Sequence, residues 1–358
     1  MKLPDISSIL FLGTDDVVAL SAIRAIGTAL PRTSLHTLSN NTDKVQISNY
    51  SKYVRSHRTL EHSEGVELLD ELIFRIKDCK AEILLPIDED SVRFVSMNSE
   101  ALKNHVKLPP LSPVDLLDSL ISKDRLAELL KAKGFQSPET HPVKNLDYSK
   151  LSKNFFPCLM KPIRGSGGSD FIKIKDIAGL EKLLGNEKYE DFILQEMIPG
   201  SDIGCNILAV DGEVKAHTIQ RGIIKEAYSF SKGIRFENNK ILFAQVEQFT
   251  RDIGFSGIAN LDYRLDDSDR QPKLIDFNAR YWSNLEGSKA AGIDFALLNC
   301  LEALKYPYEK PAFKNCNYLL GRAVLSRFSS SNGSIPTFTD LKSRITDPLP
   351  ELLRVFKK

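Results

Sequence analysis

The chain has 358 residues, a length that predicts two or three domains, each large enough to bury its own core. Its 42% apolar and 27% charged residues exclude a disordered or collagen-like chain. Lys and Arg number 48 against 47 Asp and Glu, so a net charge of +1 provides no overall attraction for nucleic acid or an anionic membrane. Any recognition of phosphate must therefore be local.

The cysteines and the apolar segments indicate the cellular setting. Five scattered cysteines form no CxxC pair and no cluster with histidine at metal-ligand spacing. The apolar run near the start is too short for a secretory signal, and no segment approaches the 18 apolar residues of a membrane span. We expect a soluble cytoplasmic protein that binds neither nucleic acid nor membrane.

The first part of the chain alternates between strand and helix patterns. The GxGxxG spacing of a dinucleotide fold is absent after the first strand. We therefore predict a doubly wound α/β domain over residues 1–112 that presents a surface for a substrate. Strands are expected at 8–13, 34–39 and 81–87, and helices at 17–27 and 65–79.

An acidic loop follows the last of these strands. Asp88, Glu89 and Asp90 lie at the carboxyl end of a strand, where ligands collect in open α/β sheets. The same acids would also stabilise the start of a helix through its dipole. Both interpretations stay open, and the helix start is the commoner one.

The middle of the chain predicts a linker and a small lobe. The Pro-rich stretch 107–115 is typical of a linker, and apolar spacing predicts a helix over 121–135 that ends at Gly134. Shorter strand and helix patterns then alternate as far as 198. We expect an α+β small lobe over 113–195 and a larger lobe over 196–358, with a helix over 285–306.

A glycine-rich loop carries the strongest local signal. Lys161 is followed by Gly165, Ser166, Gly167 and Gly168 at the end of a predicted strand. Successive backbone N–H groups in such a loop close over an anion, and the lysine adds a positive charge. The order of residues excludes a Walker A loop. A plain flexible hairpin is the alternative.

Two strands joined by a polar turn carry the second signal. Alternation places Asn260 and Asp262 on one face of the first strand, and Asp276, Asn278 and Arg280 on one face of the second. If the strands pair, Asp262 lies opposite Asp276. Two carboxylates and an amide oxygen suit Mg²⁺, with the arginine directed at a transferring phosphoryl group. An amphipathic hairpin with its polar face in water is the alternative.

Two further segments lie between these signals. The strand that ends in Gln195 and Met197 offers backbone groups beside apolar side chains, which suits a purine edge, and Asp202 could accept from ribose hydroxyls. An ordinary strand and turn is the alternative. Residues 217–236 contain four cations, of which Lys225 is the preferred contact for a phosphate or substrate carboxylate. Exposed charges on a loop are the alternative for each of them. The six histidines form no relay and are interpreted as structural or exposed.

The order of these elements over about 120–300 resembles the ATP-grasp superfamily. The stretch after Asp276 is similar to that of carbamoyl-phosphate synthetase large subunits and of ligases related to D-aspartate ligase. The resemblance implies an α/β domain followed by a two-lobed ATP-grasp fold. It places Lys123, Lys161 and the glycine loop on the nucleotide phosphates, Gln195 and Met197 at the adenine, and Asp202 at the ribose. It makes Asp262, Asp276 and Asn278 the metal ligands and Arg280 the residue that stabilises the transferred charge. With Lys225 from the cation-rich segment, Arg280 is the expected catalytic residue.

The expected function is an ATP-dependent carboxylate–amine ligase that forms an amide or peptide bond through an acyl phosphate and releases ADP and phosphate. Its cofactors would be ATP and Mg²⁺, with Mn²⁺ as a substitute, and its partners a small-molecule carboxylate and an amine. A homo-oligomer is compatible with the sequence. The alternatives are a small-molecule kinase, an enzyme that forms carboxy-phosphate, and an ATP-binding module without turnover.

Overall fold

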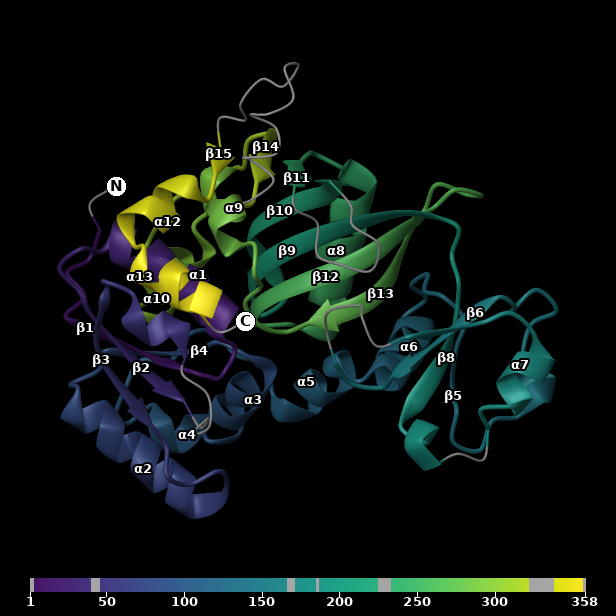
Figure 1. Ribbon diagram of the computed structural model, residues 1–358, viewed down its shortest axis with the longest axis horizontal. Helices are drawn as coiled ribbons and strands as arrows, with labels where there is room; N and C mark the ends of the chain where they lie inside the picture. The colour runs from purple at the N-terminus through teal and green to yellow at the C-terminus, as the bar shows by residue number, and fades with distance from the viewer. Residues whose placement is uncertain are drawn as a thin grey trace.

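The structure, a computed structural model, describes residues 3–39, 46–165, 171–184, 187–224, 233–321 and 338–356. These residues form three β-sheets that follow one another along the molecule (Figure 1). A four-stranded parallel sheet lies at one end, a seven-stranded sheet in the middle, and a second four-stranded sheet at the other end. The predicted combination of α/β and α+β structure is confirmed.

The N-terminal sheet has helices on both faces, as a doubly wound domain requires. Its strand order is β3-β2-β1-β4, and all its strands are parallel. Ile9 packs in one core with helix α1, while its neighbour Leu10 packs in another with helix α2. This alternation follows from the two-residue period of a strand. The elements are β1 (Ser8–Leu12), α1 (Asp16–Ala29), β2 (Ser34–Ser39), η1 (Ile47–Tyr50), β3 (Val54–Thr59), α2 (Gly65–Asp78) and β4 (Ile83–Pro86).

The acidic loop after β4 starts the short helix α3 (Glu89–Met97), which α4 (Ser99–Leu102) follows. The Asp88 carboxylate accepts hydrogen bonds from the Ser91 backbone N–H at 3.0 Å and from the Thr14 backbone N–H at 2.6 Å. A Cβ on Gly13 would lie 2.9 Å from the Asp88 carboxylate, so glycine is needed there. Asp88 therefore caps a helix and ties it to the loop after β1.

The predicted linker is shorter than the proline pattern suggests. Pro113 precedes the helix α5 (Val114–Ile121), which the sequence analysis did not predict. Helix α6 (Lys123–Ala132) follows after one residue, and Gly134 ends the turn beyond it with φ of +74°. Leu117 of α5 packs with Leu126 of α6 into the core of the middle sheet, which explains why a second helix precedes the predicted one.

The small sheet at the far end has the order β5-β8-β6-β7. Its two faces differ in character. Met160 and Leu194 point into the core under α7 (Ile177–Glu181), whereas Lys161 and Gln195 occupy the alternate positions on the same strands. The elements are β5 (Thr140–Pro142), η2 (Tyr148–Lys150), β6 (Cys158–Pro162), β7 (Ile172–Ile174), η3 (Glu187–Tyr189) and β8 (Phe192–Glu196).

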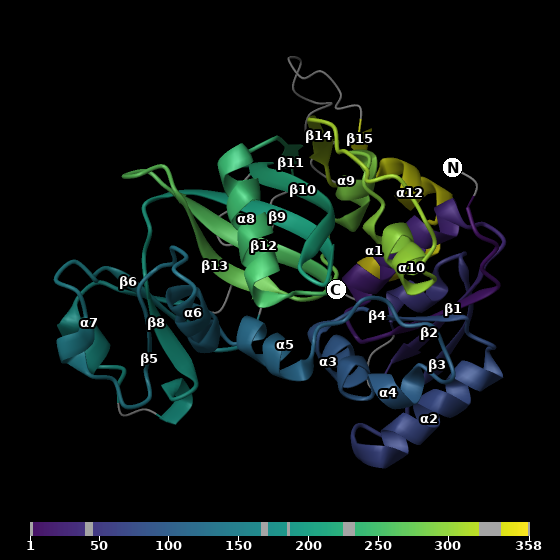
Figure 2. The ribbon, with the colours of Figure 1, turned by 180° about the vertical axis from the view of Figure 1, so that it is seen from behind.

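The middle sheet has the order β13-β12-β9-β10-β11-β14-β15. Helix α8 (Lys240–Ile253) covers one of its faces, as Figure 2 shows, and packs there on residues such as Leu261. The opposite face carries Ile258 and, two and four residues further on, Asn260 and Asp262. The strands are β9 (Gly200–Val210), β10 (Glu213–Ile224), β11 (Gly233–Phe236), β12 (Gly257–Asp266), β13 (Pro272–Asn278), β14 (Cys316–Leu319) and β15 (Phe338–Thr339).

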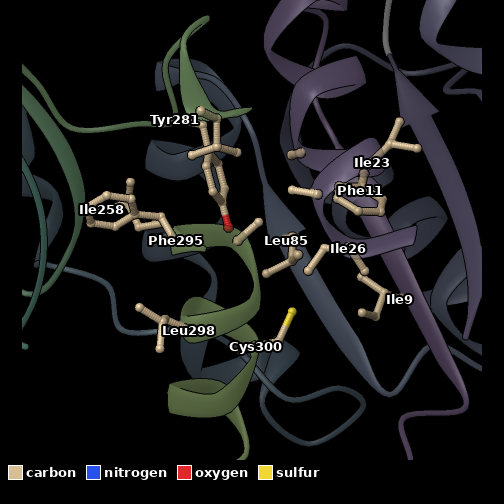
Figure 3. Close-up of a cluster of buried hydrophobic side chains, with 14 of the residues drawn as sticks. Ile9, Phe11, Ile23, Ile26, Leu85, Ile258, Tyr281, Phe295, Leu298 and Cys300 are labelled. Carbon is tan, nitrogen blue, oxygen red and sulfur yellow. The ribbon is translucent and has the colours of Figure 1, made fainter. Parts of the chain in front are cut away.

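One apolar core joins the N-terminal sheet to the middle sheet. The helix predicted over 285–306 is two helices, α9 (Leu285–Ala290) and α10 (Phe295–Ala303), because Gly292 between them has φ of +109°. Figure 3 shows Phe295 of α10 beside Ile258 of the middle sheet, with side chains of β1 and α1 on the other side of that helix. This shared core fixes the carboxyl edge of the N-terminal sheet against the middle sheet.

The C-terminal helices α12 (Leu341–Thr346) and α13 (Leu349–Phe356) dock on the N-terminal domain. The buried Arg24 side chain of α1 donates through Nε to Asp347 at 3.0 Å and through Nη1 to Glu351 at 3.2 Å. The Asp347 carboxylate also accepts from Ser51 Oγ at 2.7 Å. The end of the chain is thereby held through a hydrogen-bonded ion pair.

Candidate active site

Strands β12 and β13 pair as the sequence analysis expects. Asp262 lies opposite Asp276, and Asn260 lies opposite Asn278. A β-bulge follows between Asp262 and Tyr263. The four polar side chains share the face that α8 does not cover, because they occupy alternate positions on the two strands.

The two carboxylates repel one another. The pKa of Asp262 rises to about 7, first because the carboxyl is buried and then because of the charge on Asp276. Arg280 and a hydrogen bond from Asn278 oppose this rise. A cation between the carboxylates would relieve the repulsion, so the electrostatics fit a metal site.

The neighbouring amide completes the candidate ligand set. The Asn278 side chain is almost fully buried, and its Nδ2 lies 3.4 Å from Asp262 Oδ2. Within the described ranges, no three His, Cys, Asp or Glu side chains form a cluster suited to a metal ion. The protein therefore offers two carboxylates and one amide, oxygen donors of the kind that suit a hard divalent cation.

Two lysines approach the carboxylates from other elements. Lys123 begins α6 and is 7% exposed, and its Nζ lies 3.6 Å from Asp276 Oδ1 and donates to the Gly165 carbonyl at 2.8 Å. Lys161 lies on β6, and burial lowers its pKa to about 8 although Asp276 raises it. Positive and negative groups thus meet between the small sheet and the middle sheet, an arrangement suited to a phosphate chain with its cation.

Of the residues expected at the adenine and ribose, Gln195 lies on β8, Met197 directly after that strand, and Asp202 on β9. Gln195 is buried and donates to Thr140 Oγ1 at 3.2 Å. The Asp202 carboxylate accepts from Arg264 Nη1 at 2.6 Å. Arg264 also donates to the Ile198 carbonyl, with Nη2 at 3.1 Å. Arg264 thus links the two segments. It lies opposite Asp202 on the neighbouring strand, and the sequence analysis gave no signal for it.

The comparisons with known proteins agree with this arrangement. Residues 121–283 match the family model of the ATP-grasp domain. The chain contains an ATP-grasp domain. An uncharacterised protein of Methanocaldococcus jannaschii is 28% identical over 190 residues, which cover 51% of this chain and 47% of that protein. The chain thus spans about half the length of the curated relative that it matches.

Solved structures share the fold well beyond the ATP-grasp domain. The L-amino acid ligase from Bacillus licheniformis has 18% identity and a TM-score of 0.64, covering 87% of this chain and 76% of that one. N5-carboxyaminoimidazole synthetase from Staphylococcus aureus complexed with ADP has 11% identity and a TM-score of 0.68, covering 92% and 87%. The biotin carboxylase domain of Hydrogenobacter thermophilus 2-oxoglutarate carboxylase, with MgADP and bicarbonate, has 13% identity and a TM-score of 0.64, covering 88% and 74%. These matches confirm the predicted fold.

The N-terminal domain contributes one side chain to the site of the ATP-grasp domain. The Glu89 carboxylate, at the start of α3, lies 3.4 Å from Arg280 Nε. Burial raises the pKa of Glu89, while the Arg280 charge lowers it. Arg280 also donates to the Asn278 Oδ1 at 3.1 Å and to the Tyr281 carbonyl at 2.8 Å. The two acidic residues therefore have different roles: Asp88 caps the helix, and Glu89 faces the ATP-grasp domain.

Several predicted site residues lie outside the described residues. They are Ser166, Gly167, Gly168 and Lys225. Of the glycine loop, Gly165 is described and has φ of +124°, a backbone conformation that favours glycine. The roles given to these residues stay predictions.

His217 and the cysteines have no role in the candidate site. His217 stacks on Phe243 with ring centroids 3.8 Å apart, and burial lowers its pKa to about 4, as expected for a structural histidine. All five cysteines are free thiols. Among the helices described, none has the length and apolar character that crossing a bilayer requires.

Proposed function

We propose that this protein is an ATP-dependent ligase that joins a small-molecule carboxylate to an amine and releases ADP and phosphate. One observation carries the proposal: two lysines, two opposed carboxylates, a buried amide and Arg280 converge where the small sheet faces the middle sheet. We propose that residues 1–112 supply part of the substrate pocket, and that 113–195 and 196–358 are the small and large lobes. We assign the reaction to the cytoplasm, which the free thiols support.

The reaction needs positioning and charge neutralisation rather than a nucleophilic side chain. A substrate carboxylate oxygen attacks the γ-phosphorus of ATP, and the bond to the β-phosphate oxygen breaks to leave ADP. The amine nitrogen then attacks the acyl carbon, phosphate leaves with the C–O bond electrons, and the nitrogen loses a proton. Mg²⁺ or Mn²⁺ at Asp262, Asp276 and Asn278 would neutralise phosphate charge. Lys123 and Lys161 hold the phosphate oxygens, and Arg280 stabilises the charge that develops on the transferring group.

The experiment that tests the proposal is release of phosphate from Mg-ATP against a matrix of amino acids, with bicarbonate as a separate arm. The expected products are ADP, phosphate and an amide identified by mass. AMP with pyrophosphate as the main nucleotide products would refute the ligase mechanism. A stable phosphorylated product would indicate a kinase, and phosphate release that depends on bicarbonate would indicate formation of carboxy-phosphate. Tight ATP binding without turnover in every mixture would indicate a binding module.

Metal binding should depend on pH. The pKa of Asp262, raised from its usual 3.8 to about 7, means that a proton occupies the carboxyl below pH 7 and competes with the cation. The apparent affinity for Mn²⁺, measured without nucleotide by the electron paramagnetic resonance of free Mn²⁺, should rise about tenfold per pH unit up to pH 7 and level off above about pH 8. In the metal-free protein the same raised pKa stabilises the fold at low pH, and this stabilisation is lost as the pH rises through 7.

The control for this prediction is Asp262→Asn, which should bind Mn²⁺ more weakly and without that pH dependence. Constant affinity of the native chain between pH 6 and pH 8 would contradict the prediction.

Glu89 offers a place for the amine. We propose that the substrate carboxylate pairs with the Arg280 guanidinium. Glu89, which lies 3.4 Å from that guanidinium, is then free to bind the substrate ammonium group. Glu89→Gln should raise KM for the amine about tenfold or more and leave KM for ATP within twofold, because the amide lacks the charge that pairs with ammonium. Initial rates at varied amine and varied ATP separate the two effects.

The next residue provides a matched control. Asp90 is exposed on the same first turn of α3, so Asp90→Asn makes the same chemical change outside the site. Its KM for the amine should stay within twofold of the native value. Equal KM values in the Glu89 and Asp90 variants would exclude Glu89 from the amine subsite.

A further inference from the structure

A row of polar side chains, all buried except the half-buried Asn260, crosses the middle sheet from the candidate metal site to helix α9. Asn278 Nδ2 lies 3.3 Å from Asn260 Oδ1, and Asn260 Nδ2 lies 3.0 Å from Asn206 Oδ1. Asn206 Nδ2 lies 3.0 Å from Thr218 Oγ1, which is 3.2 Å from Ser288 Oγ. The backbone register explains the row, because Asn278, Asn260 and Asn206 are direct partners across three neighbouring strands and Thr218 pairs with Asn206 on the fourth.

The hydrogen bonds that link the three amides along the row all run in one direction. Each amide nitrogen donates toward Thr218, and the Asn278 nitrogen also lies 3.4 Å from Asp262 Oδ2, so along the row each amide oxygen faces away from Thr218. At the site end, the Asn278 oxygen accepts from Arg280 at 3.1 Å. An amide oxygen binds a cation, whereas an amide NH₂ group carries only donors. The direction of the row therefore decides whether Asn278 is able to act as a ligand.

Because the row is largely buried, the orientation of each amide depends on the orientation of its neighbours. Asn206, Thr218 and Ser288 are 0% exposed, so water does not reach these side chains to replace a lost partner. Reversal of one amide would place nitrogen against nitrogen and oxygen against oxygen at its two neighbours, which leaves buried groups unpaired. The pairing therefore opposes the reversal of any single amide.

The row also marks the border between the apolar core and the charged site. On the same sheet face, Ile258 and Leu208 lie on one side of it, in the core shared with the N-terminal sheet. Asp262 and Asp276 lie on the other side, one alternate position further along β12 and β13. The row therefore lies directly beside the candidate metal ligands.

We propose that Asn260, Asn206 and Thr218 are positioning residues that hold the Asn278 amide with its oxygen toward the divalent cation. The inference rests on the proposed function, because it assigns a purpose to the orientation of a proposed ligand. It predicts that a change two or three strands away from Asn278 alters metal binding without any contact with the metal.

The test measures Mn²⁺ affinity without nucleotide or substrate, by the electron paramagnetic resonance of free Mn²⁺. Asn206→Leu removes the acceptor for Asn260 and should weaken Mn²⁺ binding about tenfold or more, as changes to outer-shell partners do. Thr218→Val removes the acceptor for Asn206 and should weaken it about three- to tenfold. If Asn206→Leu fails to fold, the Thr218 variants carry the test.

Two controls separate positioning from general stability. Thr218→Ser keeps the hydroxyl, and Ser288→Ala deletes a buried hydrogen bond beyond the last amide, so both should stay within twofold of the native affinity. The melting temperature of each metal-free variant is measured alongside. Loss of affinity that follows melting temperature across all four variants, or no loss in Asn206→Leu and Thr218→Val, overturns the inference while leaving the proposed function intact. A native chain that binds no Mn²⁺ overturns the metal site itself, and the inference with it.

Discussion

The Asp276→Asn variant should turn over at least about 10²-fold more slowly than the native chain at saturating Mg-ATP, on the scale of losing one electrostatic contact in an active site. The substitution is nearly isosteric, but it removes the charge that faces Asp262 and that lies 3.6 Å from Lys123 Nζ. The melting temperature should stay within a few degrees, because the lost attraction to lysine is offset by relief of the repulsion between the carboxylates. Steady-state rates and thermal unfolding provide the two measurements.

Asp267→Asn is the matched control, since Asp267 lies in the exposed turn between the same two strands. Its turnover should equal that of the native chain within twofold. Near-native turnover in Asp276→Asn would remove the metal assignment and, with it, the strongest support for the ligase proposal.

The second large effect is expected from Arg280→Lys, which keeps the charge and changes its geometry. The Arg280 guanidinium contacts three oxygen acceptors at once. Its nitrogens lie 2.8 Å from the Tyr281 carbonyl oxygen, 3.1 Å from the Asn278 amide oxygen and 3.4 Å from the Glu89 carboxylate. A lysine ammonium lacks the planar fork that reaches three such partners. We expect kcat to fall about 10²-fold or more, because the charge no longer lies where it develops on the transferring group.

Arg270→Lys tests the same substitution at an exposed site in the turn after β12. It should leave kcat unchanged within twofold. An Arg280→Lys variant that retains more than about half of the native kcat would show that charge alone is sufficient and that the fixed guanidinium geometry is not needed.

Where residues of the site lie close together in the sequence, their arrangement could be predicted from it. The two-residue period of a strand puts Asp276, Asn278 and Arg280 on one face, and the turn of five residues between β12 and β13 makes the pairing of these strands local. The order of the motifs resembled the ATP-grasp superfamily, and residues 121–283 match the model of that domain. The roles of Ser166, Gly167, Gly168 and Lys225, which lie outside the described residues, stay predictions.

Helix boundaries were less predictable. The proline pattern over 107–115 favoured a linker, so helix α5 was not predicted. The apolar residues of α5 pack in the core of the middle sheet, which the local sequence does not show. The apolar run over 285–306 did not reveal the break at Gly292, since glycine in a helix pattern marks either an interruption or a tolerated residue. The docking of the C-terminal helices through Arg24 and Asp347, more than 300 positions apart, left no local signal.

By itself, the sequence determined the fold class and the face of β12 and β13 that carries the candidate ligands, because both depend on periodicity within short segments. It indicated the ATP-grasp domain through the order of motifs that are far apart in the chain. Only the tertiary structure decided which distant groups meet that face. Glu89 reaches Arg280 because an apolar core joins the N-terminal sheet to the middle sheet. The row that includes Asn206 and Thr218 depends on the register of four strands, which long-range packing fixes and which no local pattern encodes.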